Sequence, residues 1–413
     1  MKRLAFLLAL LAAAACESST VEPDPDPDPN PNPNPSCAQV SSPAVLGLGC
    51  VAERYTGEVS VRGQYAYTSS WGARGKTGTR GNAIKVWDVS GNVPALVDSV
   101  IIPNASTTGD VQVTDDGKHL VVATEFTPGS IVVLSLADPR RPVQVSRFSS
   151  DNTGPGVHTA EVSRVNGKLY AFLSVDPSGA ATPARLVVVD LSDPATPREV
   201  LSRNMGEPYL HDVFVRDGIL FTGLWNGGMT IWDIGGGGRG GTPENPVQLG
   251  NVKTVGGAVH NIWWVHTAGS KRFAIVGEEQ GLVFGNSSAG DIHVVDVSDF
   301  TNPREVAFYN VPGAGTHNFS VDEERGVLYA AYYNGGVRAL NVSGDLSACA
   351  ASARAADGRC DLTKAGREVG RTLDAPLGGR NFYIWGVQTT GAHVYASDML
   401  NGLWKLDASK LRP

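Results

Sequence analysis

The sequence predicts an all-β protein, a single seven-bladed β-propeller of four-stranded antiparallel blades. Two observations support this prediction: a short apolar motif recurs along the chain, and residues that favour turns follow each copy. The composition agrees, because 49 glycines and 25 prolines among 413 residues suit many short strands joined by turns. A chain of this length is too long for one compact sandwich, so it forms several domains or one repeat array.

The repeat is clearest in Leu186–Pro197, LVVVDLSDPATP, where a fully apolar strand precedes an Asp-Ser-Asp-Pro turn and a second proline. Close or weaker copies occur at Ile84–Pro94, Ile131–Pro142, Met229–Ile234, Ile292–Pro303, Val337–Ser343 and Leu403–Ser409. Seven copies of one motif predict seven repeats of one structural unit. Each copy is expected to be a third strand, because both faces of a propeller blade pack on neighbouring blades and its strands are apolar throughout.

Four strands complete each predicted unit at a spacing of roughly 50 residues, which is typical of a propeller blade. In the unit around Met229, the first strand is His211–Val215 and the second is Ile219–Gly223, with an Arg-Asp-Gly turn between them. The seven first strands are expected to begin near Gly57, Gly109, His158, His211, His260, His317 and Trp385.

The seventh blade has no fourth strand of its own, because the sequence reaches Pro413 soon after the third strand. The N-terminal segment Ser42–Gly47 (SPAVLG) resembles Asn245–Gly250 (NPVQLG), the expected fourth strand of blade four. We therefore expect the N-terminal segment to supply the outer strand of blade seven. This strand would close the ring and cover an exposed sheet edge.

Residues 1–15 are predicted to be a secretory signal peptide. Lys2 and Arg3 precede the apolar run Leu4–Ala12, which is too short to span a membrane. Ala13–Cys16 resembles a bacterial lipobox, so Cys16 is predicted to carry a lipid; the alternative is ordinary signal peptidase cleavage, which leaves Cys16 free. The lipid would anchor the exported protein to the bacterial outer membrane or cell surface, with the periplasmic side as an alternative.

Residues 16–36 are predicted to be a stalk between the lipid and the propeller of residues 37–413. Proline occupies every second position of Pro23–Pro35, which prevents helix and sheet hydrogen bonds and favours an extended chain. At ~3.1 Å per residue this stretch would reach about 40 Å. The lipid is the only membrane contact that the sequence predicts, because no other segment is long and apolar enough to span a bilayer.

Four further cysteines, Cys37, Cys50, Cys349 and Cys360, are expected to form disulfides, as is common in exported proteins. The local pairing, Cys37 with Cys50 and Cys349 with Cys360, is the simplest of the three that four cysteines allow. Zinc binding is disfavoured, because no C-x-x-C spacing occurs.

The charge of the chain argues against nucleic acid as a partner. The formal net charge of −7 becomes −9 when Lys2 and Arg3 leave with the leader, since 32 basic and 41 acidic residues remain. The sequence contains no basic stripe. We expect a monomer that binds a protein, a glycan or a small molecule.

The third-strand motif, LVVVD at Leu186–Asp190, resembles that of the LVIVD-repeat proteins, which are bacterial exported propellers. The resemblance covers about residues 42–413, essentially the folded body. It implies the fold and export, but no single reaction. Propellers host many unrelated functions, so function has to be argued from a site.

A row of histidines is expected at one end of the propeller axis. Four consecutive blades place histidine at the start of the first strand, and blade seven places a tryptophan there: His158, His211, His260, His317 and Trp385. Blades one and two have only Gly57 and Gly109 at this position. Imidazoles are therefore expected to line half of the axial mouth and to leave the other half open.

The loops between second and third strands reach the same face and add acidic and aromatic groups. These are Glu125, Asp176, Trp225, Glu278, Glu279, Tyr333 and Asp398. Imidazole nitrogens with carboxylates nearby are what a divalent metal ion requires. The four histidines are therefore candidate ligands of a divalent metal, and Glu161 or Glu278 is the candidate acid/base of a metal-dependent enzyme.

The structural alternative is that each histidine fastens its own blade. WD-repeat propellers also carry a histidine just before the first strand, where it bonds neighbouring turns and backbone. Polar residues beside the histidines could take part in the same bonding: Thr159, Asp212, Asn261 and Asn318. The deciding question is whether the imidazoles converge on one point or each bonds its own blade.

Aromatic and acidic residues near the mouth are candidates for ligand contact. Trp225, Tyr333 and Trp385, together with Asp398, would suit a sugar ring or a protein hot spot if the rings are exposed. Trp87 and Trp232 lie inside third strands and are expected to pack in the core.

Two glycine-rich segments stand outside the strands. The loop Trp71–Asn82, with Arg74, Lys76 and Arg80, could hold an anion against backbone amides; a flexible solvated loop is the alternative. Gly235–Gly241 is expected to be a flexible excursion on the opposite face.

The sequence predicts a cell-envelope binding module that uses the His- and aromatic-lined axial face. The alternative is a metal-dependent hydrolase or oxidoreductase with a histidine and carboxylate site at the mouth. A third reading, a scaffold in an envelope complex, would show as an apolar patch on the outer or opposite face. Neither a G-x-S-x-G nor an H-E-x-x-H motif occurs, so the sequence leaves the question of enzymatic activity open.

Overall fold

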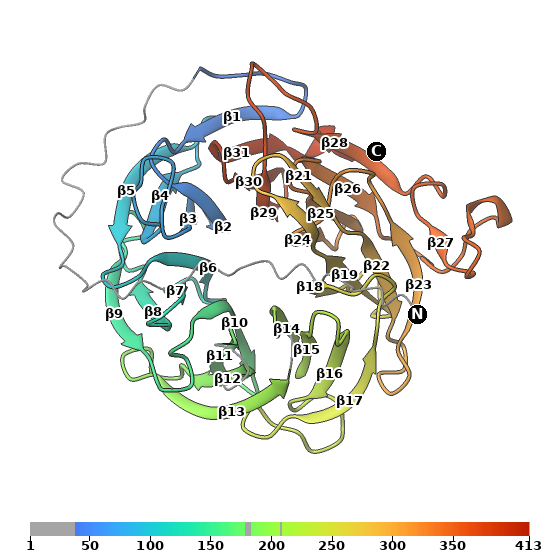
Figure 1. Ribbon diagram of the computed structural model, residues 1–413, viewed down its shortest axis with the longest axis horizontal. Coiled ribbons are helices and arrows are strands. Elements are labelled where there is room, and N and C mark those ends of the chain that lie inside the picture. The colour runs from blue at the N-terminus through green and yellow to red at the C-terminus, as the bar shows by residue number, and fades with distance from the viewer. Residues whose placement is uncertain (1–37, 178–182, 207–208, 413) are drawn as a thin grey trace, which may run out of the picture.

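The computed structural model describes residues 38–177, 183–206 and 209–412. Within these residues, seven antiparallel sheets surround a central axis, which confirms the predicted seven-bladed all-β propeller (Figure 1). In six blades the four strands follow chain order from the axis to the rim. The predicted signal peptide, the lipid on Cys16, the stalk and Cys37 lie outside the described residues.

Each blade runs from an inner first strand to an outer fourth strand. The first strands are β2 (Tyr55–Arg62), β6 (Thr107–Val113), β10 (Val157–Val165), β14 (Asp212–Arg216), β18 (Val259–Trp264), β24 (Phe319–Asp322) and β29 (Ile384–Thr390). The second strands are β3 (Tyr65–Trp71), β7 (His119–Glu125), β11 (Lys168–Val175), β15 (Ile219–Gly223), β19 (Phe273–Glu278), β25 (Val327–Ala331) and β30 (His393–Asp398). The third strands are β4 (Ala83–Asp88), β8 (Ser130–Ser135), β12 (Ala184–Asp190), β16 (Met229–Asp233), β22 (Ile292–Asp296), β26 (Val337–Asn341) and β31 (Gly402–Asp407). The fourth strands are β5 (Ala95–Ile101), β9 (Val143–Phe148), β13 (Arg198–Gly206), β17 (Val247–Val252), β23 (Arg304–Tyr309), β28 (Glu368–Thr372) and, in blade seven, β1 (Val45–Cys50).

The seven motif copies are the seven third strands, as predicted. The aspartate that ends the motif accepts a hydrogen bond from the backbone N–H two residues later. Asp190 accepts from Ser192 at 2.8 Å, and Asp296 accepts from Ser298 at 3.0 Å. A side-chain oxygen in this position stabilises the turn that leaves the strand, which explains why the repeat keeps an aspartate there.

The N-terminal strand closes the ring, as predicted. β1 pairs with β31 in antiparallel register, with Leu48 opposite Trp404 and Gly49 opposite Leu403. The Leu48 side chain is fully buried. The last blade therefore has an outer strand from the opposite end of the chain, which covers the edge of β31.

The hydrophobic core lies between adjacent blades. Trp87 and Trp232 occupy equivalent positions of β4 and β16 and are both buried, which confirms their predicted packing role. Each indole N–H donates to a threonine hydroxyl of the adjacent strand at 3.0 Å, Thr68 in blade one and Thr222 in blade four. The repeat thus satisfies the only polar atom of each ring inside the core.

Blade five carries two additions that the repeat does not predict. A hairpin of β20 (Gln280–Val283) and β21 (Ser287–Ala289) lies between its second and third strands. In addition, β27 (Cys360–Asp361) pairs in parallel with β23 as a fifth strand. β27 belongs to the long loop after β26, and the predicted Cys349–Cys360 disulfide is present in this loop.

The described helices are two short 3₁₀ turns, η1 (Ala351–Ala353) in the disulfide loop and η2 (Ala408–Lys410) after β31. Neither is long enough or apolar enough to span a bilayer.

The glycine-rich segment after β16 is folded around Asp233, which corrects the expectation of a flexible excursion. The Asp233 carboxylate accepts hydrogen bonds from four backbone N–H groups, those of Gly235, Gly237, Arg239 and Gly241, at 2.6–3.2 Å. The segment is therefore an enlarged form of the turn that ends every third strand.

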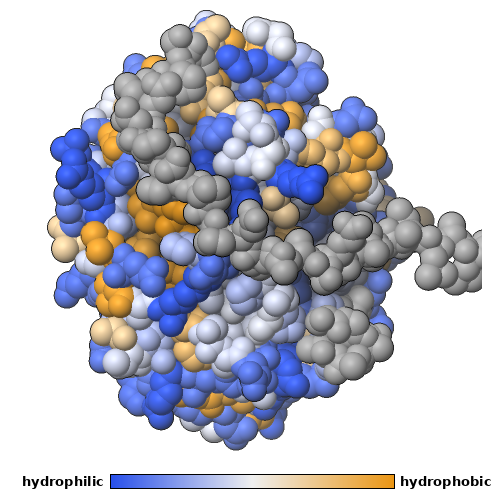
Figure 2. Space-filling model, turned by 60° about the vertical axis from the view of Figure 1, so that its left-hand side comes forward, coloured by the Kyte–Doolittle hydropathy of each residue, from blue (hydrophilic) through white to orange (hydrophobic). Residues whose placement is uncertain are grey.

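Exposed apolar side chains gather on one face of the propeller. The outer wall seen in Figure 2 is mostly hydrophilic, with small and separate hydrophobic areas. On this wall, Val143 and Val145 of β9 are exposed. Within the described ranges, six of the nine exposed large apolar residues belong instead to loops that reach the face where the first strands begin, which we call the axial face: Phe126, Tyr209, Val255, Leu282, Val283 and Phe284.

Candidate functional site

The first strands enclose a cavity of about 440 Å³ on the propeller axis. The inner edge of each first strand has no partner strand, so its backbone groups need side-chain partners. Side chains of the neighbouring blade supply them: the Ala160 N–H donates to Asp110 at 2.9 Å, and the Val61 N–H donates to Gln388 at 2.6 Å. Many of the polar groups that line the cavity are therefore structural.

An arc of aromatic rings lies at the end of this cavity nearest the axial face. Its members come from the starts of the first strands of five consecutive blades: His158, His211, His260, His317 and Trp385. The ring centroids follow one another at 4.1–4.2 Å. The predicted row of histidines thus exists, and its members contact one another instead of facing separate blades.

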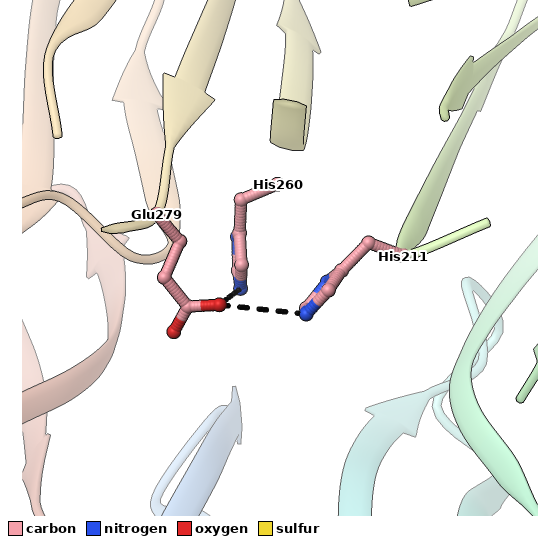
Figure 3. A group of neighbouring side chains, drawn as sticks. All are labelled: His211, His260 and Glu279. Carbon is pink, nitrogen blue, oxygen red and sulfur yellow. Dashed lines mark ion pairs between the residues drawn. The ribbon is translucent and has the colours of Figure 1, made fainter. Parts of the chain in front are cut away.

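Two of the four histidines converge on one carboxylate. The Nε2 atoms of His211 and His260 lie 3.5 Å and 3.8 Å from Oε2 of Glu279, the residue that follows β19 (Figure 3). The ligand atoms of all three residues lie within 4.8 Å of one another. A tetrahedral ion with bonds of about 2.1 Å separates its ligand atoms by about 3.4 Å, so this group needs little movement to hold a metal.

Three of the four ring nitrogens of this group are buried without the hydrogen-bond partners that buried polar atoms usually have. Among the described residues, neither nitrogen of His260 nor Nδ1 of His211 has a hydrogen-bond partner. His260 is 2% exposed. An unpaired buried imidazole is costly, so these nitrogens point to a missing partner of the group.

Burial sets the protonation of the three groups. It lowers the pKa of His211 and of His260 well below the usual range, and the neighbouring imidazoles lower both further. Both rings are therefore neutral, with a lone pair that can bind a metal ion without competition from a proton. Burial also raises the pKa of Glu279, whereas the hydrogen bond from Tyr333 opposes this rise.

Two aromatic residues of the predicted ligand-binding set surround the group. Trp225 stacks on His211, with centroids 5.2 Å apart and planes 24° from parallel. Tyr333 was expected to present its ring to a ligand, but it is fully buried and its hydroxyl donates to Oε1 of Glu279. Tyr333 therefore orients Glu279, as a partner behind a metal ligand does.

His158, at one end of the arc, differs electrostatically from its neighbours. Its Nδ1 lies 3.6 Å from Oδ1 of Asp176. Burial alone would lower the pKa of His158, but the carboxylates of Glu125 and Asp176 raise it to about 10. The ring is therefore an imidazolium at neutral pH and is not available as a metal ligand.

The mouth is less open above blades one and two than the sequence predicts. The Glu125 carboxylate occupies the space beside Gly109, where a side chain would collide with Oε1. In blades three to seven a histidine or tryptophan takes the equivalent position. The absence of a side chain at Gly109 thus makes room for the Glu125 carboxylate near His158. This carboxylate fills the space at Gly109 that the sequence predicted to be open.

His317 supports the structural alternative that the sequence left open. Its Nδ1 lies 2.7 Å from the backbone oxygen of Trp385, so it fastens blade six to blade seven. Of the four predicted ligands, the structure therefore brings His211 and His260 together around a carboxylate. It places His158 and His317 beside them in other roles.

The two predicted acid/base residues, Glu161 and Glu278, have their contacts away from the group of His211, His260 and Glu279. Glu278 contacts His293, with Oε2 3.2 Å from Nε2, and accepts from the Asp291 N–H at 3.1 Å. Glu161 lines the axial cavity and accepts from the backbone of Val215.

Asp398 is fully buried within blade seven. Its carboxylate accepts from the Trp404 indole at 2.9 Å and from the Asn401 amide at 2.6 Å. The backbone N–H groups of Tyr383 and Leu400 also donate to it. These bonds give Asp398 a structural role.

The loop Trp71–Asn82 does not present its lysine to an anion. The Lys76 Nζ donates to the backbone oxygens of Val51 and Leu400 at 2.6 and 2.7 Å. Arg54 in turn donates to the backbone oxygen of Arg80 at 2.8 Å. The loop therefore fastens blade one to the closing strand and to blade seven.

Glu279 is the ligand that sequence reasoning placed at the mouth but did not select. Adjacent strand residues point to opposite sides, so one member of the pair Glu278 and Glu279 had to face the axis. The sequence alone does not say which one. The structure directs Glu278 into blade five and Glu279 toward His211 and His260.

The LVIVD repeat family model matches residues 180–204 and 287–311. No curated protein matches the sequence. Among solved structures, the chain is similar to the β-propeller domain of Cps50 (Swd1) from Myceliophteria thermophila, at 12% identity and a TM-score of 0.56, over 88% of this chain and 99% of that one. It is also similar to Sqt1 from Saccharomyces cerevisiae, at 9% identity and a TM-score of 0.54, over 91% and 87%.

At these identities the two likenesses show the fold alone. The matched repeats include β12 and β22, the third strands with the clearest motif copies. The chain is therefore a seven-bladed β-propeller that carries LVIVD repeats.

Proposed function

We propose that this protein is an exported, lipid-anchored binding module whose axial site holds a divalent transition-metal ion between His211, His260 and Glu279. The observation that carries the proposal is the approach of two imidazole Nε2 atoms to one carboxylate oxygen. The propeller with its LVIVD repeats supports an interaction module. The metal site gives that module a place where a ligand binds.

The donor set favours a particular class of ion. Two neutral imidazoles and one carboxylate suit Zn²⁺, Fe²⁺, Mn²⁺ and related ions better than Ca²⁺ or Mg²⁺, which take oxygen ligands. Three protein ligands leave at least one coordination position for water or for an oxygen or nitrogen atom of a ligand. Tyr333 would hold Glu279 in place as the ion binds.

The tether belongs to the same proposal. A signal peptide over residues 1–15, a lipid on Cys16 and a proline-rich stalk would present the axial face outside the cytoplasm. A Cys16→Ser variant should leave the membrane fraction and appear in the soluble extract. If it stays in the membrane fraction as the unaltered protein does, the lipid anchor is wrong.

Metal content tests the central claim. The mature protein, purified without a histidine tag, should contain about one transition-metal ion per chain by mass spectrometry. The double variant His211→Ala/His260→Ala should contain none. The matched control is His119→Ala/His393→Ala, which removes two histidines outside the site and should keep the ion. Metal-free protein whose melting temperature is unchanged by Zn²⁺, Mn²⁺ or Fe²⁺ would refute the proposal.

A metal-dependent enzyme is the second candidate. The observation that favours it is the position of His158, whose ring lies 4.2 Å from that of His211 and whose Nδ1 lies 3.6 Å from the Asp176 carboxylate. A proton donor beside a metal with an open position is typical of hydrolytic sites. Turnover in a hydrolase screen that is lost in both His211→Ala and His158→Gln would establish this reading. If the metal-loaded protein shows no turnover, the enzyme candidate is wrong and the binding-module proposal stands.

A further inference from the structure

A hairpin from blade five covers one side of the axial face. Phe284, in the turn between β20 and β21, contacts Tyr55 and Trp71 of blade one, with centroids 4.7 Å and 5.7 Å away. The Tyr383 hydroxyl, from the start of blade seven, donates to the backbone oxygen of Ser287 at 3.3 Å. The hairpin therefore reaches across the mouth to blades seven and one (Figure 1). A ligand has to approach the metal site from the other side.

The other side, over blades two to four, is bordered by exposed aromatic rings. Phe126 and Tyr209 are 47% and 42% exposed. Tyr209 lies 6.0 Å from Trp225, and Trp225 stacks on His211, so the rings lead from the surface to the metal site. This approach is distinct from the outer wall, because all of these residues lie in loops of the axial face.

An acidic group lies among these rings. Gly156 borders both the backbone of Phe126 and the carboxylate of Asp176, which places the two side by side. The Asp176 side chain is 20% exposed and has His158 at 3.6 Å. The approach thus combines flat apolar faces with a carboxylate that can accept hydrogen bonds from a ligand.

This combination selects the chemistry of the ligand. A purely apolar ligand would leave the open metal position without a partner and would cover the part of the Asp176 carboxylate that faces solvent, which is costly in a partly buried site. A folded protein surface needs about 800 Å² on each partner and does not reach a site that a hairpin covers on one side. A sugar ring has an apolar C–H face for stacking and hydroxyl groups that donate to carboxylates and bind metal ions.

We propose that the ligand of the axial site is a carbohydrate whose ring stacks on Trp225 and Tyr209, with hydroxyl groups directed to Asp176 and to the metal. This inference rests on the proposed metal site, because it takes the metal as one of the contacts. The rings supply affinity, and the carboxylate and the metal select for vicinal hydroxyl groups.

Calorimetry with defined sugars tests the inference. The probes are oligosaccharides of glucose, galactose, mannose and N-acetylglucosamine, added to the zinc-loaded mature protein. At least one should bind, and Trp225→Ala, compared with the unaltered protein at equal zinc content, should weaken that binding tenfold or more. Trp225→Phe keeps an aromatic face and should retain most of the affinity, which separates loss of stacking from misfolding. Trp71→Phe, under the hairpin, is the matched control and should bind normally.

The outcomes separate the two proposals. If the protein holds its metal but binds no sugar of the set, or binds one equally well after Trp225→Ala, the carbohydrate proposal is wrong and the metal site stands. If His211→Ala/His260→Ala binds the sugar as the unaltered protein does, the metal contact in this proposal is wrong.

Discussion

The hydroxyl of Tyr333, in a loop of blade six, donates a hydrogen bond to Glu279 of blade five. The backbone at Tyr333 has a positive φ of 44°, as Trp225 does at the equivalent position of blade four, where φ is 50°. The two loops share an aromatic-Asn-Gly-Gly sequence, so this conformation is a property of the repeat. The repeat places an aromatic ring at the axial mouth twice, once over His211 and once behind Glu279.

Tyr333→Phe should weaken metal binding about 10- to 100-fold without unfolding the protein, because loss of a hydrogen-bond partner behind a ligand has this effect. Competition with a chromogenic chelator measures the affinity. Tyr332→Phe is the control: Tyr332 is equally buried, but its hydroxyl donates to the backbone oxygen of Gly290 at 3.1 Å. Equal affinities of both variants would mean that Tyr333 does not position Glu279.

Asp233→Asn should destabilise the protein by about 2 to 3 kcal/mol, because an amide has one acceptor oxygen where the carboxylate accepts four backbone N–H groups. Urea unfolding measures the change, and proteolysis should cleave within Gly235–Gly241. Asp190→Asn is the control, since Asp190 accepts one backbone N–H, that of Ser192. A loss no larger than that of the control would show that the glycine-rich segment does not depend on Asp233.

The stability should fall between pH 6.5 and pH 9 because of His293. Burial alone would lower its pKa, but hydrogen bonds to Glu278 and Glu305 raise it to about 9. The folded pKa exceeds the unfolded value of about 6.5, so the contribution is complete below pH 6.5 and disappears as the pH rises through 9. A shift of this size corresponds to about 3 kcal/mol.

Urea unfolding of the unaltered protein and of His293→Gln at pH 6 and pH 9 measures this contribution. The stability difference between the two should be largest at pH 6 and small at pH 9. A difference that does not change with pH would mean that His293 is neutral in the folded protein.

Leu48→Ala should lower the free energy of unfolding by about 2 to 5 kcal/mol, because the side chain of Leu48 in β1 is fully buried in the core of blade seven. The ring closes through β1, so unfolding should stay a single transition at a lower denaturant concentration. Leu46→Ala, on the same strand but only partly buried, should cost much less. A separate early transition for β1 would show that the ring remains stable without it.

The fold could be predicted because the third strands are apolar on both faces and end in one type of turn. The closure by β1 followed from the likeness of Ser42–Gly47 to the outer strand of another blade. The hairpin of β20 and β21 and the added strand β27 could not be predicted. Their segments are short and contain glycine or charged residues, and their pairing depends on contacts made after the blades have formed.

The candidate site could be predicted only in outline. The four histidines recur at one position of the repeat, so their common face followed from the sequence. The sequence could not show that His211 and His260 share Glu279 while His317 bonds the backbone of Trp385. These differences depend on how each ring is turned and on how the blades twist around the axis.

The pairing of β1 with β31 also sets the order in which the molecule can be completed. β1 leaves the ribosome before every blade, yet its partner β31 belongs to the seventh blade. Every other outer strand can pair with a neighbour made shortly before it, whereas β1 has to remain without a sheet until β31 has been made. A chain that stops before β31 therefore leaves β1 without its partner strand and the ring open.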